Sequence, residues 1–365
     1  MALILNGTDG VQFNDSSLQG AAASPYVLKN RIINGDMVIS QRGTSAVTID
    51  QTGGTYTLDR WYGRDDSDGA YSIQQVSDAP TGFTNSLKIT ITTIDSSLSA
   101  AQYGFVGQFI EGYNTADLSF GTASAKTLTL SFWVKGSVTG QFGGSITNSA
   151  QDRTYPFSYT ILAANTWEQK TVTVTGDTTG TWLTTNGAGI GVNFAVGIGS
   201  NFLATANTWA GSFKMSATGQ TNLYATSAAT LQFTGVQLEI GSTATPFERR
   251  LYNQELANCQ RYYYKNLPAA GSIGVSSGVM YNTALSISYI QFPISMRTAP
   301  TGSVSAVSDF AAIGGGVSPA PTAMTFTTGT LSARIDCTLS GVTTGHGMTL
   351  QSSSSASFIA FTAEL

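Results

Sequence analysis

The chain has 365 residues, a length that predicts two or three domains. Charged residues make up 10% of it, against about 25% in an ordinary soluble domain, while hydrophobic residues make up 41%. The single histidine, His346, excludes a multi-histidine metal site within one chain, and the net charge of −4 argues against nucleic-acid binding. No apolar run approaches the roughly 18 residues of a membrane span, and no secretory signal is expected. We therefore expect no metal, no cofactor, no nucleic acid and no membrane insertion.

Residues 1–30 are expected to form an arm that is separate from the rest of the chain. Leu3, Leu5, Val11 and Phe13 alternate with polar residues as in a strand, and residues 20–25 are typical of a linker. One or two short strands in such an arm could be completed by the sheet edge of another protein. The alternative is a frayed terminus.

Residues 31–245 show the period of two that is typical of β-strands. Leu128, Leu130, Phe132 and Val134 alternate with residues of the opposite face, and residues 190–198 repeat the pattern. Glycine, asparagine and proline turns recur between such runs. Many short antiparallel strands over this length predict an all-β, jelly-roll-like sandwich.

Residues 246–265 are predicted to form a connector helix. Thr245 is the expected N-cap, with Pro246 in the first turn and Glu248 at the third helical position. One helical face would then carry four large or buried-type residues, which we expect to pack on a neighbouring domain or chain as an oligomer interface: Tyr252, Leu256, Cys259 and Tyr263. Cys259 and the second cysteine, Cys337, are too few for a disulfide framework and are expected to be buried thiols.

Residues 266–365 are predicted to form a smaller C-terminal β-sandwich, because alternation returns at residues 285–289, 331–339 and 359–365. This segment has only five charged residues: Arg297, Asp309, Arg334, Asp336 and Glu364. A surface with so little charge would be poorly solvated. Burial between identical copies would explain it.

Carboxylate pairs are the only plausible catalytic groups, and their spacing singles out no pair. The candidates are Asp59, Asp65, Asp66, Asp68, Glu111, Asp152 and Glu168. Residues 64–69 resemble a calcium loop, with Asp66 and Asp68 alternating, but they lack the downstream glutamate. A solvated turn is the alternative for residues 65–68. We expect no enzymatic activity.

Aromatic residues are the better candidates for binding. Sugars present apolar C–H faces that tryptophan and tyrosine rings complement. Trp61, Tyr62, Trp182 and Trp209 are expected in loops at one end of the sandwich, and Trp133 on the outer side of a strand. The alternative is that these rings belong to the core or close the ends of the sandwich.

Several segments resemble a domain that recurs in the tail fibres and related virion proteins of tailed bacteriophages. The similarity runs through residues 30–45, 57–61, 130–136 and 166–168, and is strongest at residues 217–220, 235–250 and 255–263. The arm (residues 5–13) and residues 292–297 resemble the ends of such fibres. The resemblance implies a carbohydrate-binding-like jelly roll in a homotrimeric virion appendage, made in the host cytoplasm. It implies no catalytic residues.

These observations favour a short trimeric tail fibre that attaches to other virion proteins by residues 1–30 and adsorbs to host surface polysaccharide. The chain has no long heptad or β shaft, which favours a short appendage over a long fibre. Two alternatives stay open at this point. One is a capsid or tail decoration protein with a purely structural role, and the other is a polysaccharide depolymerase.

Overall fold

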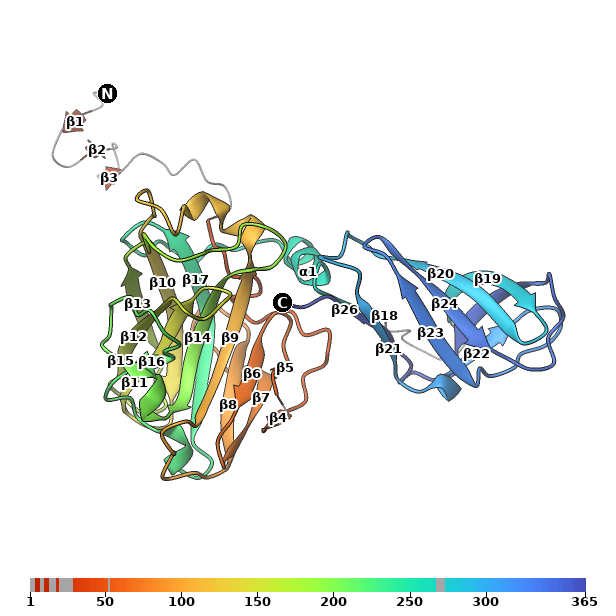
Figure 1. Cartoon of the computed structure of the whole chain (residues 1–365), viewed down its shortest axis with the longest axis horizontal. Coiled ribbons are helices and arrows are strands. Elements are labelled where there is room, and N and C mark those ends of the chain that lie inside the picture. The colour runs from red at the N-terminus through yellow and green to blue at the C-terminus, as the bar shows by residue number, and fades with distance from the viewer. Residues whose placement is uncertain (1–3, 7–9, 13–17, 20–28, 52, 267–272) are drawn as a thin grey trace.

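The computed structural model describes residues 29–51, 53–266 and 273–365, together with three short strands nearer the N-terminus. These strands form a small antiparallel sheet in the order β1 (Ile4–Asn6), β2 (Gly10–Gln12) and β3 (Leu18–Gln19). Leu5 and Val11 lie in β1 and β2, whereas Leu3 and Phe13 fall outside the described residues. In Figure 1 this sheet stands apart from the two sandwiches.

Two six-stranded sheets form the first sandwich, which confirms the all-β, jelly-roll-like prediction. The first sheet has the order β13 (Glu168–Val174), β10 (Leu128–Gly136), β17 (Thr230–Ile240), β8 (Ser86–Thr93), β7 (Ala70–Val76) and β4 (Val47–Ile49). The second has the order β12 (Thr154–Ile161), β11 (Gly140–Thr147), β14 (Ala188–Ile198), β9 (Tyr103–Glu111), β6 (Tyr62–Asp65) and β5 (Thr55–Tyr56). All pairs within both sheets are antiparallel.

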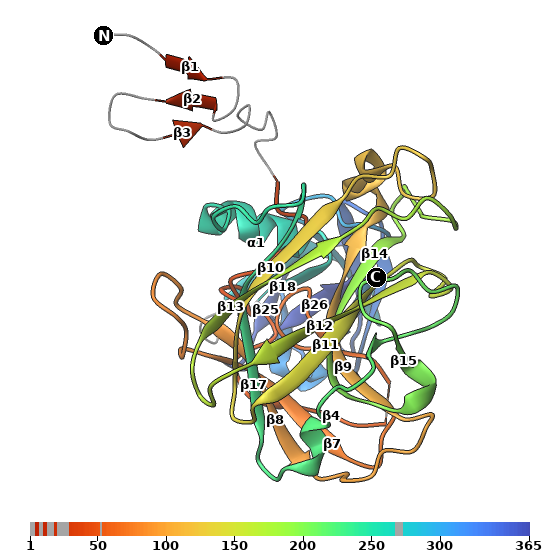
Figure 2. The same cartoon turned by 90° about the vertical axis from the view of Figure 1, so that its left-hand side faces the viewer.

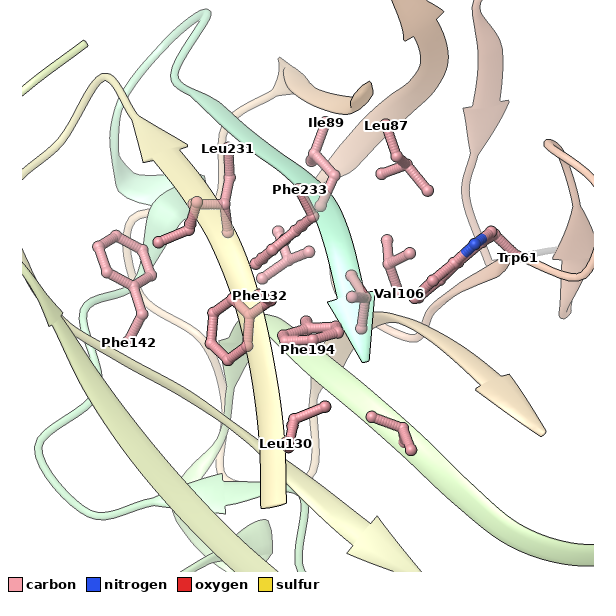
Figure 3. Close-up of a cluster of buried hydrophobic side chains, with 14 of the residues drawn as sticks. Trp61, Leu87, Ile89, Val106, Leu130, Phe132, Phe142, Phe194, Leu231 and Phe233 are labelled. Carbon is pink, nitrogen blue, oxygen red and sulfur yellow. The ribbon is translucent and has the colours of Figure 1, made fainter. Parts of the chain in front are cut away.

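The core between these sheets is built from the alternating residues that the sequence pattern marked. Phe132, Phe194 and Phe233 meet at its centre, with ring centroids 5.0 Å and 4.4 Å apart along the series (Figure 3). Such aromatic pairs stabilise a core beyond the effect of buried area alone.

The second sheet is covered on its outer face as well. The covering segment contains η3 (Ser200–Phe202), β15 (Leu203–Ala204) and β16 (Ser216–Ala217), and its residues Phe202, Leu203 and Phe213 pack in one cluster with Tyr103 and Phe105 of β9. η4 (Leu223–Ala225) instead lies at the core between the two sheets, where Tyr224 packs against Tyr71. The aromatic residues on this part of the outer face are therefore structural.

The connector helix is shorter than predicted. Helix α1 spans Tyr252–Gln260 and begins after Leu251, so the expected start at Thr245 is wrong. Thr245 instead donates to Glu239 on β17, and the backbone N–H of Glu248 donates to Gln237 on the same strand. The Glu248 carboxylate accepts from the backbone N–H groups of Lys29 and Asn30. These tertiary bonds use the groups that would have capped a helix.

A three-stranded and a six-stranded sheet form the second sandwich. The small sheet has the order β18 (Tyr263–Asn266), β26 (Ile359–Thr362) and β21 (Thr301–Val304). The large sheet has the order β22 (Phe310–Ile313), β25 (Gly347–Ser352), β19 (Gly274–Asn282), β20 (Leu285–Gln291), β24 (Ser332–Thr338) and β23 (Ala323–Thr328), with η5 (Val307–Asp309) before β22. Both cysteines are buried free thiols, as predicted.

Residues 363–365 lie between the two sandwiches, where the chain end is seen in Figure 1. The strand pattern predicted up to residue 365 ends at Thr362, and Glu364 then forms ion pairs with Arg60 and Arg42 of the first sandwich. The Arg60 side chain is 1% exposed and the Glu364 side chain 6%. A buried charge needs such a partner.

A second ion pair joins the sandwiches nearby. Arg261 donates to both oxygens of Glu111 at 2.8 Å and 2.6 Å, and the Tyr262 hydroxyl donates to Glu111 at 2.7 Å. Burial alone would raise the pKa of Glu111, but the bonds from Arg261 and Tyr262 hold it below its usual value. The carboxylate therefore stays charged at the junction.

We expect Glu364→Gln to lower the free energy of unfolding by about 3–5 kcal/mol, because Arg60 would keep a buried charge without its carboxylate. Urea titration followed by circular dichroism measures this. The matched control is Asp78→Asn, which removes an exposed partner of Lys135 and should cost about 1 kcal/mol or less. Equal effects of the two changes would contradict the importance of this ion pair.

Candidate functional site

Two loops at one end of the first sandwich build a pocket, which we call the aromatic pocket. The loop after β9 contains η1 (Gly112–Asn114) and η2 (Ala116–Leu118), and the other loop joins β13 to β14. They are tied together by backbone hydrogen bonds from Gly112 to Gly187, from Tyr113 to Thr185 and from Gly121 to Asp177.

A glycine fixes how closely the two loops approach. Gly121 has φ +82°, and a Cβ atom there would lie 2.7 Å from the Gly180 carbonyl oxygen and 3.3 Å from Trp182. Other residues rarely adopt this backbone conformation. Trp182 is thereby held beside the first loop.

The aromatic pocket has a volume of about 390 Å³, within the range of small-molecule sites. It is lined by aromatic and aliphatic surface together with five hydroxyl groups: Thr115, Ala116, Ser119, Phe120, Thr122, Ser124, Trp182, Leu183, Thr184 and Ile190. No charged side chain lies among these described residues. The lining can therefore offer C–H contacts and neutral hydrogen bonds.

Two aromatic rings, Phe120 and Trp182, line this pocket, and Trp209 packs against both of them. The centroid of Phe120 lies 4.8 Å from that of Trp182 and 6.0 Å from that of Trp209, and the two tryptophans are 5.5 Å apart. Their indole N–H groups donate to the backbone carbonyls of Thr179 and Thr175. Both tryptophans are half-buried. The structure thus brings together two of the aromatic residues that were expected in loops.

A buried ion pair supports the second loop. Arg153 donates to both oxygens of Asp177, at 2.7 Å and 2.8 Å, and its guanidinium lies 5.9 Å from the Trp209 ring. Burial alone would raise the pKa of Asp177, but the bonds from Arg153 and Thr179 hold it below its usual value. Asp177 therefore remains an acceptor that orders the start of this loop through Thr179.

Trp133 lies elsewhere, on the outer face of the first sheet. Phe132 and Val134 on either side of it point into the core, whereas Trp133 is half-buried. It packs beside Phe83 over Gly235, which has φ +60°. Trp133 thus lies on the outer side of its strand, as the alternation of residues 128–134 predicted, and away from the aromatic pocket.

Trp61 and Tyr62 are not surface platforms. Trp61 is 1% exposed and donates to the Asn34 carbonyl at 3.0 Å, so it is a core residue (Figure 3). Tyr62 is 6% exposed, lies stacked 5.2 Å from Phe109, and bonds to Asn193. The expectation that they project from loops is wrong, because both side chains pack within the first sandwich. Trp61 lies in the core between the sheets, and Tyr62 lies on the Phe109 ring.

The predicted helical interface does not form one continuous exposed face. Tyr252 is 60% exposed and Leu256 half-buried, but Cys259 is fully buried. Tyr263 lies in β18, where the Arg42 guanidinium stacks 3.6 Å from its ring. Intramolecular packing therefore satisfies half of the surface that we expected to need a partner.

The candidate carboxylates have structural partners. Asp59 accepts from Gln41, Asp152 from Asn148 and Glu168 from Lys170. Asp65 is buried and accepts from Ser67, whereas Asp66 and Asp68 are exposed. Among the described residues, no group of three or more His, Cys, Asp and Glu side chains is placed to hold a metal ion.

A second pocket, of about 250 Å³, lies beside the junction and is polar: Asn30, Arg31, Ile33, Asn114, Arg250 and Asn258. Its two guanidinium groups are held by Asp117 and Glu255. This pocket has no aromatic surface, so we regard it as part of the structural network around α1.

The sequence analysis missed Phe120 and the hydroxyl residues around it. They lie in a loop without periodicity, so strand patterns give no signal for them. The one available signal was composition, because Ser119, Thr122 and Ser124 surround a single aromatic residue.

The burial of these tryptophans predicts a difference in stability. Trp61→Ala should lower the free energy of unfolding by about 3–5 kcal/mol, because it leaves a core cavity. Trp182→Ala should cost about 1–2 kcal/mol, because less of its surface leaves water on folding. Thermal and urea unfolding of both variants would check this, and a larger effect at Trp182 would contradict its position at a surface pocket.

No protein-family model matches the chain, and no curated protein matches it. Among solved structures, it is similar to the enzymatically active domain of tailspike protein 4 of bacteriophage CBA120, with 13% identity over 61% of this chain and 22% of that one, and a TM-score of 0.31. It is also similar to the family 11 carbohydrate-binding module of Clostridium thermocellum in complex with a β-1,3-1,4-mixed-linked tetrasaccharide (12% identity, 56% and 99% covered, TM-score 0.28). A third is the xylan-binding domain CBM22-1 of Paenibacillus barcinonensis (10%, 55% and 98%, TM-score 0.25). Similarity at this level does not assign a function to the chain.

Proposed function

We propose that this protein is a non-enzymatic bacteriophage virion appendage, a short homotrimeric tail fibre that binds neutral sugar units of host surface polysaccharide in the aromatic pocket. The observation that carries this proposal is the meeting of Phe120 and Trp182 with five hydroxyl groups in one pocket. The virion role rests on the resemblance of residues 235–250 and 255–263 to fibre proteins.

The chemistry of the pocket supports a sugar as its ligand. A pyranose ring has an apolar C–H face that a tryptophan complements, while its hydroxyls exchange hydrogen bonds with Ser and Thr side chains. Because both indole N–H groups already donate to backbone carbonyls, the rings offer their apolar faces and edges. The uncharged lining favours a neutral sugar over a uronic or sialic acid.

The same lining supports binding over hydrolysis. Glycoside hydrolysis requires two carboxylates on opposite sides of the scissile bond. The described lining has neither, and five of the seven candidate acids accept hydrogen bonds in structural roles: Asp59, Asp65, Glu111, Asp152 and Glu168. A role in adsorption also suits weak, reversible contacts, since linked copies raise avidity by about 10²–10⁴-fold.

Binding to immobilised neutral polysaccharides, including mixed-linkage β-glucan, xylan and mannan, tests the proposal by surface plasmon resonance. We expect Trp182→Ala to weaken binding at least about tenfold, because a buried tryptophan contact contributes about 1.4 kcal/mol or more. The matched control is Trp167→Ala. Trp167 is also half-buried, but it contacts Lys135 on another face of the sandwich.

Four other outcomes would contradict part of the proposal, two of them the position of the binding site and two the function. Binding by Trp182→Ala at the wild-type level would exclude the aromatic pocket, and loss of binding in Trp133→Ala alone would move the site to the sheet face. Failure of the wild-type protein to bind any polysaccharide of the panel or the cells of the phage's host would favour a purely structural decoration protein. Release of reducing ends from the bound polysaccharide would favour a depolymerase.

We further propose that residues 1–30 attach the appendage to other virion proteins, by adding strands such as β1 and β2 to a partner's sheet. Deletion of residues 1–28 should leave polysaccharide binding unchanged and abolish incorporation into particles. Western blotting of purified virions measures this. Incorporation of the truncated protein at the normal level would overturn the proposed role of the arm.

A further inference from the structure

Large apolar side chains are exposed unevenly along the chain. Of the thirteen in the described residues, six lie between residues 29 and 266: Ile94, Tyr113, Leu162, Leu183, Leu251 and Tyr252. The other seven lie in the much shorter segment 273–365: Ile273, Val279, Tyr281, Tyr289, Ile313, Val317 and Leu331. The second sandwich is therefore the more apolar surface.

The few charges of this sandwich are already partnered within the chain. Glu364 and Arg297 bond to the first sandwich, and Asp309 accepts from Ser305. Arg334 and Asp336 pair with each other at 2.6 Å. Each of these five thus has a hydrogen-bond or ion-pair partner within the chain, and Lys265 on β18 lies over the Phe358 ring.

The strand register places three of these seven residues, Val279, Tyr289 and Ile313, on one face of the large sheet. One row across the six strands, in the order of the sheet, is Ile313, Thr349, Ser277, Tyr289, Arg334 and Thr327. The next row on the same face is Gly347, Val279, Ile287, Asp336 and Thr325. The residues that alternate with these rows, including Met280, Ile290 and Ile335, form the core.

We call this surface the outer sheet face. Tyr289 of the first row is 57% exposed, and Tyr281, two residues after Val279 on β19, is 59% exposed. Aromatic residues such as tyrosine are enriched in surfaces that pack against protein. The only charges on the face are one Arg and one Asp, two residues apart on β24.

We propose that copies of this chain associate through the outer sheet face of the second sandwich, turned toward a common axis. The proposal rests on the homotrimer in the proposed function and names its contact surface. A second copy fits this face because the Arg334–Asp336 pair is self-complementary, so that Arg334 of one copy can meet Asp336 of the next without excess charge. A strongly charged partner would find no counterpart.

The C-terminal position of this face is compatible with the other proposed contacts. The aromatic pocket is built by loops of the first sandwich, one of which bonds to Arg297 through Asn186. The large sheet of the second sandwich lies beyond α1 in Figure 1 and behind the first sandwich in Figure 2. Association through the outer sheet face would leave the pocket of each copy open. It would also remove from water the apolar side chains that no intramolecular contact covers.

Light scattering coupled to size-exclusion chromatography of the full chain tests this at micromolar concentration. We expect about three times the chain mass of 38.2 kDa for the wild type, as for a trimer. In Tyr289→Lys and Tyr281→Lys we expect the mass to fall to 38.2 kDa. The control is Leu162→Lys. Leu162 is 77% exposed just after β12 on the first sandwich, and its replacement should leave the mass unchanged.

A monomeric wild type would overturn the proposal, and so would an assembly that persists in both tyrosine variants. Circular dichroism and thermal unfolding check that these variants fold, and because both side chains are exposed we expect melting temperatures near that of the wild type. Polysaccharide binding by each single site should persist in the monomeric variants. Wild-type binding by Trp182→Ala with assembly intact would contradict the proposed binding site and leave this contact surface unaffected.

Discussion

The arrangement of the two sandwiches depends on a buried guanidinium. Arg60 lies beneath the first sandwich, stacks 3.6 Å from the Tyr262 ring and pairs with Glu364. A charge at 1% exposure requires a partner, and the carboxylate comes from Glu364, which lies between the two sandwiches. The junction is therefore polar and specific in direction, because guanidinium groups bond along fixed directions. Arg261 pairs with Glu111 at the same junction, and Arg297 donates to the backbone carbonyl of Asn186 in the first sandwich.

Period-two alternation predicted the strands of both sandwiches, because each strand has one core face and the pattern is local. It did not predict the start of α1, since the polar groups of Thr245 and Glu248 bond to β17 and to residues 29–30, which are distant in sequence. Trp182 and Trp209 were expected with Trp61 and Tyr62 in loops at one end of the first sandwich, and the structure brings the rings of these two to 5.5 Å from each other. The expectation was wrong for Trp61, because its partners Phe194 and Asn34 are distant in sequence and nothing within residues 57–62 indicates them.

Several residues in the segments that resemble phage fibre proteins belong to the internal framework of the first sandwich. Asn30, Asn34 and Asp59 are buried and hydrogen-bonded, as are Gln237 and Glu239 on β17. Their chemistry holds segments together and leaves no group for a ligand. The aromatic pocket, by contrast, is built from loops outside the strongest similarity. Loops of this kind can vary in sequence while the buried framework keeps its hydrogen bonds.

The position of β17 has a consequence for how the chain folds. It lies at the centre of the first sheet, between β10 and β8, yet it is the last strand of that sandwich to be synthesised. Its register with β8 joins residues such as Thr230 and Thr90, which are far apart in sequence. Such non-local pairing slows folding, and until β17 arrives two strands keep open edges that invite wrong pairing. Productive folding of this sandwich therefore has to wait until about two thirds of the chain has left the ribosome, and the nascent chain is a natural substrate for chaperones during that interval.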